Sequence, residues 1–162
     1  MKPAICLLAL AALAAGSAQA ADVSRVYATP DARFATSIAV PADANVVYLS
    51  GALSPIADPA APKDKPKPLA GSTGAQTEGI FKAFEAQLKA HGMGLGDIVS
   101  MRVYLIADPA TGVMDFNGMN GAYAKSFGSA AQPNRPVRAT VQVAGLAAPT
   151  ALVEIEAVAA KR

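Results

Sequence analysis

The segment PVRATVQVAGLAAPTALVEIEAV, residues 136–158, carries the clearest secondary-structure pattern of the chain. Apolar and polar residues alternate over 137–143 and again over 152–158, which is typical of half-buried β-strands. The Ala- and Pro-rich residues between the two runs predict a loop. The core-facing sides of the two strands are expected to carry Val137, Ala139, Val141, Val143, Val153, Ile155 and Ala157.

Charged side chains occupy the other faces of the same strands. If the strands pair antiparallel, one register places Thr140 opposite Glu154 and Arg138 opposite Glu156. One interpretation is a cross-strand ion pair on a solvated face, worth only about 0–1 kcal/mol, and the pattern alone favours it. The other is that a neighbouring subunit covers this face. Arg138 then binds a small carboxylate through two N–H donors, and Glu154 acts as an acid–base group that holds a water.

The rest of the chain predicts one α+β domain with a mixed sheet and both helices on one face. Further strands are expected over 34–40, 46–49 and 98–106. A first helix is expected to begin at the capping box Thr73-x-x-Gln76 and to end at Gly92, and a second to cover 115–127. The apolar residues that recur at helical spacing are expected to form the core: Ile80, Phe81, Phe84, Leu88, Phe116, Met119, Tyr123 and Phe127.

Composition excludes several classes of protein. The 162 residues carry a net charge of only +2 and no Trp, which argues against a dedicated nucleic-acid binder. The apolar fraction of 52% comes largely from Ala and the N-terminus, so it does not indicate a polytopic membrane protein. Disordered, collagen-like and disulfide-scaffold classes are excluded as well.

The first twenty residues have the pattern of an export signal. Met1-Lys2 supplies a positive start, residues 5–15 form a short apolar run, and Ala18-Gln19-Ala20 offers small residues for cleavage after Ala20. An uncleaved anchor is the alternative. Cleavage removes the single cysteine, Cys6, and leaves one mature domain, 21–162, in the periplasm or secreted medium. That domain has no disulfide and no thiol ligand or nucleophile.

Two further features favour simple interpretations. His91, the lone histidine, stands at the expected end of the first helix, where a histidine more often interacts with terminal carbonyls than performs catalysis. With one histidine and no mature cysteine, no metal site is expected. Residues 55–68 contain five prolines and three lysines, which favours a solvated loop over a binding segment.

Six segments in order carry a resemblance to a known family: Tyr48-Leu-Ser-Gly51, Gly74-Ala-Gln-Thr77, Gly96-Asp-Ile-Val99, Met119-Asn120-x-x-Tyr123-x-x-x-Phe127, Pro136-x-Arg138-Ala-Thr-Val-x-Val143 and Val153-Glu-Ile-Glu-Ala157. Together they resemble the RidA/YjgF family, also called the endoribonuclease L-PSP family, from about Phe34 to Ala159. The resemblance implies a chorismate-mutase-like α+β fold and a homotrimer with three clefts between subunits.

The resemblance also implies site residues. Arg138 matches an arginine that binds the carboxylate of a 2-imino acid, and Glu154 matches a glutamate that positions the attacking water, with one extra residue in the loop between them. Family cleft positions are matched by Ser50, Gly51, Asn120 and Thr140. Phe34 is the nearest match to a tyrosine of the family, so a phenolic hydroxyl is absent there.

The resemblance therefore implies an enamine/imine deaminase of the 2-iminobutanoate or 2-iminopropanoate type, which releases a 2-oxo acid and ammonia. Because an imine is already electrophilic, no metal or organic cofactor is expected. No nucleic acid partner is expected either, and no membrane partner after signal cleavage. The alternative is a non-catalytic trimer that binds small carboxylates or acts as a holdase. Ribonuclease activity, suggested by the older family name, is disfavoured by the charge count and the few aromatic residues.

Overall fold

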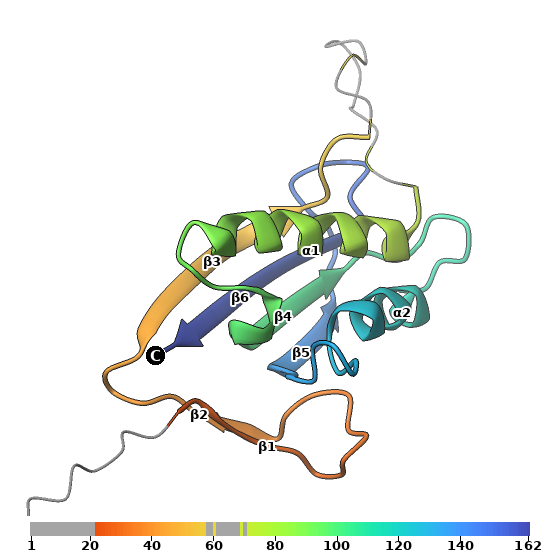
Figure 1. Cartoon of the computed structure of the whole chain (residues 1–162). Helices are drawn as coiled ribbons and strands as arrows, with labels where there is room; N and C mark the ends of the chain where they lie inside the picture. The colour runs from red at the N-terminus through yellow and green to blue at the C-terminus, as the bar shows by residue number, and fades with distance from the viewer. Residues whose placement is uncertain (1–21, 58–59, 61–68, 70) are drawn as a thin grey trace, which may run out of the picture.

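The computed structural model describes residues 22–57, 60, 69 and 71–162 (Figure 1). The predicted export signal, 1–20, and most of the Pro/Lys-rich segment, 55–68, lie outside the described residues. Just beyond that segment, Leu69 forms an isolated antiparallel bridge with Ile56.

A four-stranded mixed sheet forms the centre of the fold, with strand order β3-β6-β4-β5 (Figure 1). Its strands are β3 (Asn45–Leu53), β4 (Ile98–Leu105), β5 (Val137–Gln142) and β6 (Val153–Lys161). Helices α1 (Thr73–Lys89) and α2 (Phe116–Ser126) cover one face, and a short 3-10 turn, Leu95–Asp97, precedes β4. The predicted α+β class, with both helices on one face of a mixed sheet, is confirmed.

Each helix joins two parallel strands. β3 and β4 both run antiparallel to β6, so they are parallel to each other, and α1 makes the connection between them. α2 connects β4 to β5, which pair directly and in parallel. The expected strand over 34–40 is only β2 (Ser37–Ala39), which pairs with β1 (Ser24–Val26) in a separate ladder that the sequence did not indicate.

The hydrophobic core lies between the helices and the sheet. The face of α1 that carries Ile80 and Phe84, both fully buried, packs against the alternating residues of β4 and β6. Phe81, Tyr123 and Phe127 join the two helices through ring contacts with centroids 4.7–6.5 Å apart. The predicted core stripes are thus confirmed, except that Phe116 is 38% exposed.

The pairing predicted for the last two strands is wrong. β4 lies between β5 and β6, so Glu156 stands opposite Arg102, Glu154 opposite Tyr104, and neither opposite a residue of β5. The loop after β5 returns the chain to the centre of the sheet instead of forming a hairpin. Sequence neighbours need not be spatial neighbours when a strand enters between two others.

The core face predicted for β5 is also wrong. Arg138 pairs with Met101, which is 1% exposed and faces the helices, so Arg138 lies on the helix-covered face. Residues Val137, Ala139 and Val141 lie on the opposite face, where Val141 is 47% exposed. Alternation identified two faces correctly but did not show which of them the helices cover.

The face without helices, which we call the open face, combines apolar and charged side chains. Tyr48 of β3 is 80% exposed. Arg102 and Glu156 form an ion pair of 2.7 Å there, and the Tyr104 hydroxyl donates to the same carboxylate at 3.3 Å. These contacts lower the pKa of Glu156. An exposed sheet face with large apolar residues is typical of a surface that another chain covers.

The start of α1 differs from the predicted capping box. Ser72, not Thr73, is the N-cap, and its hydroxyl accepts from the Ala75 amide at 3.2 Å. Gln76 is 1% exposed and instead bridges to the loop before β6: its amide donates to the Thr150 carbonyl and accepts from the Leu152 amide. No helix among the described residues is both long and apolar enough to cross a membrane.

Gln76→Ala is expected to destabilise the fold by about 1–3 kcal/mol, because it removes two part-buried hydrogen bonds between α1 and the loop before β6. Chemical denaturation measures the change. Gln87→Ala, at an exposed position of the same helix, is the matched control and is expected to stay within about 0.5 kcal/mol of the unmutated protein. Equal stability of the two variants would contradict the structural role of Gln76.

Candidate active site

Arg138 is the centre of a cluster on the helix-covered face. Its Nη2 donates to Asn120 Oδ1 of α2 at 2.8 Å, and its Nη1 lies 3.8 Å from Met119 Sδ. The guanidinium carbon lies 4.4 Å from the centre of the Tyr123 ring and 5.7 Å from that of Phe34. β5 is the edge strand beside α2, so the arginine projects beneath this helix instead of into the main core. The structure thus brings the predicted Phe34, Asn120 and Arg138 together.

The charge of Arg138 has no counter-ion within the described chain. None of the ion pairs among the described residues involves it, and burial lowers its pKa, the effect expected of a desolvated cation. The aromatic faces offset part of this desolvation. A half-buried arginine without a carboxylate is costly unless an anion binds to it. The arrangement therefore suits a small carboxylate.

Polar atoms without partners lie on the two elements that frame the same arginine, α2 and β5. Asn120 Nδ2, the Tyr123 hydroxyl and Thr140 Oγ1 are buried, and none has a hydrogen-bond partner among the described residues. Burial raises the pKa of Tyr123, so its hydroxyl stays protonated and can donate. Buried polar atoms without partners are rare in folded proteins. Three of them beside one unpaired cation indicate a ligand rich in oxygen atoms.

Glu154 belongs to a second cluster, on the open face. The register of β3 and β6 shifts between Leu49 and Ala52, which places Ser50 and Gly51 at a bulge beside Glu154. A Cβ at Gly51 would lie 2.3 Å from Glu154 Oε1, so a larger residue would displace the carboxylate. The structure thus brings the predicted Ser50, Gly51 and Glu154 together.

The two clusters do not meet within one chain. Arg138 faces the helices from β5, whereas Glu154 projects from β6 on the open face, with β4 between the two strands. The predicted proximity of Thr140 to Glu154 is wrong for the same reason, because Thr140 lies on the arginine side, opposite Val103. A site that uses both Arg138 and Glu154 needs a second copy of the chain.

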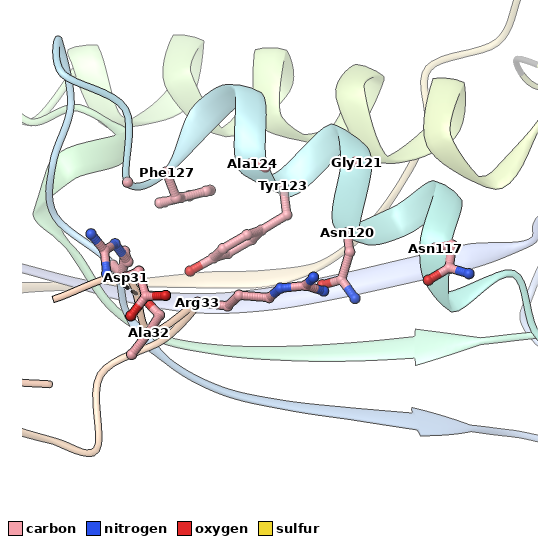
Figure 2. Close-up of a pocket in the computed structure, with 11 residues that line it drawn as sticks. Asp31, Ala32, Arg33, Asn117, Asn120, Gly121, Tyr123, Ala124 and Phe127 are labelled. Atoms are coloured by element: carbon pink, nitrogen blue, oxygen red, sulfur yellow. Dashed lines mark hydrogen bonds between the residues drawn. The ribbon is translucent and has the colours of Figure 1, made fainter. Parts of the chain in front are cut away.

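A cavity of about 510 Å³ adjoins the arginine cluster beneath α2 (Figure 2). Its walls come from α2, from residues 31–33 and from Arg135, and they include Asn120 and Tyr123. The sequence had indicated Asn120 but not Tyr123, although the two are three residues apart on one helix and so share a face. Arg33 and Arg135 were also missed, since neither belongs to a periodic segment. His91 lies in the turn after α1, at the helix end that the sequence predicts, and its side chain is exposed.

The comparisons with known proteins identify the family. A family model described as Endoribonuclease L-PSP matches residues 26–161. The chain belongs to this family. The matched range includes every candidate residue of both clusters. The family membership that the six segments indicated is confirmed.

Three known proteins illustrate what this chain is similar to in sequence and in fold. The RutC family protein PH0854 from Pyrococcus horikoshii is 36% identical over 86 residues, which span 53% of this chain and 60% of that protein. The structure of NMB1025, a YjgF family member from Neisseria meningitidis, covers 87% of this chain and 96% of its own, with 23% identity and a TM-score of 0.54. RidA from the Antarctic bacterium Psychrobacter sp. PAMC 21119 is 28% identical, covers 78% of this chain and 86% of its own, and has a TM-score of 0.52.

Proposed function

We propose that this protein is a hydrolytic deaminase of small 2-imino and enamine acids, which it converts to 2-oxo acids and ammonia. The observation that carries the proposal is Arg138: half-buried, without a counter-ion, and surrounded by unpartnered polar atoms that suit a carboxylate. A guanidinium matches the two oxygens of a carboxylate and fixes its orientation. The family, one of whose similar members is named RidA, supports the same substrate class.

The reaction needs a water as well as a bound carboxylate. Glu154 accepts a proton as the water oxygen bonds to the C=N carbon, and the proton then passes to the nitrogen. The hydroxyl proton of the resulting carbinolamine then passes through Glu154 to the nitrogen as the carbon–nitrogen bond breaks, so that ammonia leaves and the carbonyl forms. The imine carbon is electrophilic without assistance, so the proposal invokes no metal or organic cofactor.

The active site is proposed to form between two copies of the chain. One subunit contributes Arg138, Asn120 and Phe34, and its neighbour contributes Glu154 with Gly51 and Ser50. Their placement on opposite faces supports this division, as does the exposed apolar surface around Tyr48 on the open face. Closed cyclic symmetry repeats one contact around a ring, and the family resemblance specifies a trimer with three clefts.

An imine-hydrolysis assay tests the function. An amino-acid oxidase generates the 2-imino acid in the presence of semicarbazide, which traps the imine, and added protein is expected to divert imine to the 2-oxo acid and ammonia. The rate of semicarbazone formation falls in proportion to active protein. No diversion, combined with retained 2-oxo acid binding, would support the alternative, a non-catalytic trimer that binds small carboxylates, for which Arg138 alone suffices.

The N-terminal pattern supports a location outside the cytoplasm. We propose that residues 1–20 are removed on export and that the mature protein begins at Ala21, in the periplasm or secreted medium. Mass spectrometry of the exported protein measures this directly. Retention of Cys6 in that protein would contradict the proposed cleavage.

A further inference from the structure

The cavity beneath α2 is larger than a carboxylate needs. Its volume of about 510 Å³ extends from Asn120, the partner of Arg138, to the loop at 31–33 and Arg135. Pockets that bind whole small molecules typically have volumes of about 300–1,000 Å³. The side chain of the substrate therefore has room in this cavity, and the residues along the walls select it.

Arg33 is a second cation in this cavity without a partner. It forms no ion pair or hydrogen bond among the described residues, and Figure 2 shows its side chain extended along the cavity toward the end where Asn120 lies. Its charge is close enough to Arg138 to lower the pKa of that arginine. Two guanidinium groups repel each other, so an anion that contacts both stabilises the arrangement.

The loop that carries Arg33 is held in place. Arg135 donates from Nη1 and Nη2 to the Pro30 carbonyl at 3.0 Å and also bonds to the Ala32 carbonyl, while its guanidinium stacks 5.0 Å from the centre of the Tyr27 ring. Gly128 allows the close approach of Arg135, since a Cβ there would lie 2.6 Å from its Nε. Arg33 is itself exposed, and it extends from a loop whose backbone Arg135 holds in place.

The cavity wall is rich in hydrogen-bond donors. Tyr123 and Asn120 are 3% and 7% exposed, and the Tyr123 hydroxyl and Asn120 Nδ2 lack partners. In Figure 2 the Tyr123 ring points its hydroxyl away from α2, toward Asp31 and Ala32. Asp31 is the one carboxylate on the wall; its contacts with Thr29, its own backbone and Arg135 lower its pKa. Three cations lie on or beside this wall against that single carboxylate: Arg33, Arg135 and the adjoining Arg138.

We propose that this site selects dicarboxylic 2-imino acids, with Arg138 binding the carboxylate next to the imine and the neighbouring Arg33 binding the second carboxylate. The inference rests on the proposed function, because it names the substrate class of the same site. A second guanidinium–carboxylate contact in a half-enclosed cavity then distinguishes acidic from apolar side chains.

Calorimetric binding of two stable 2-oxo acids tests the selection. 2-Oxoglutarate and 2-oxopentanoate have the same chain length and differ in the terminal carboxylate. The unmutated assembly is expected to bind 2-oxoglutarate at least about tenfold more tightly. Arg33→Gln is expected to reduce the ratio of the two affinities about tenfold, whereas Lys82→Gln, which removes an equal charge from an exposed position of α1, leaves the ratio unchanged.

Equal binding of the two acids by the unmutated protein, or a ratio that Arg33→Gln leaves unchanged, would overturn the inference. Hydrolysis of the 2-imino acid derived from 2-oxopentanoate separates this result from the proposed function. If hydrolysis occurs without a preference for the dicarboxylate, the selection is wrong and the deaminase stands. If the preference is present without any hydrolysis, the ligand class stands and the deaminase is wrong.

Discussion

Arg138→Ala is expected to abolish both the binding of 2-oxo acids and the hydrolysis of 2-imino acids. Removing one partner of a desolvated charge pair costs about 2–5 kcal/mol, a loss of at least about 30-fold in affinity. Arg138→Lys is expected to restore little, because an ammonium group cannot make the two parallel contacts of a guanidinium. Calorimetry and the semicarbazide assay measure the two effects.

The control for Arg138 is a different arginine with an ordinary surface partner. Arg162 pairs with Asp43 at 2.9 Å, and Arg162→Ala is expected to leave binding and hydrolysis unchanged. Circular dichroism and light scattering show whether each variant keeps its fold and assembly. A folded Arg138→Ala variant with undiminished binding would remove the observation on which the proposed function depends.

Glu154→Gln is expected to lower the rate of hydrolysis by about 10²–10⁴-fold and to leave 2-oxo acid binding within a few-fold. The amide keeps the size and polarity of the carboxylate but cannot accept a proton from the attacking water. A loss of rate at constant affinity is the signature of a group that acts only in the chemical step. Steady-state kinetics, with binding measured separately, distinguishes the two quantities.

Glu156→Gln is the matched control for this prediction. Glu156 lies on the same strand and the same face, two residues along, but its carboxylate is already engaged by Arg102 and Tyr104. Its replacement is expected to preserve the rate. If both substitutions lower the rate equally, or if neither does, Glu154 has no specific part in catalysis.

The elements of the fold were predictable because their patterns are local. The alternation in β6 identified the buried face that contains Ile155, and helical spacing identified the core residues of α1. The pairing of β5 was not predictable from the same pattern. A strand period says nothing about which strand is the neighbour, and the α2 crossover places β5 parallel to β4.

The candidate site was predictable only in part. The strand pattern and the family resemblance both indicated Arg138 and Glu154, and the resemblance added Asn120, but the pattern placed Arg138 on the wrong face. The apolar residues of β5 were expected to face the core. Val141, one of them, is instead exposed on the face of the sheet that no helix of the chain covers. Arg33 carried no signal, because its position depends on contacts of Arg135 more than one hundred residues away in the sequence.

The most direct test of the central claim is complementation between two inactive variants. Arg138→Ala and Glu154→Gln chains with different affinity tags are co-expressed, and assemblies that hold both are isolated through both tags. In a mixed ring of three, one cleft receives Arg138 from one chain and Glu154 from its neighbour, so about one third of the unmutated activity is expected to return. Mixed assemblies that stay as inactive as either variant alone would contradict an active site built between subunits.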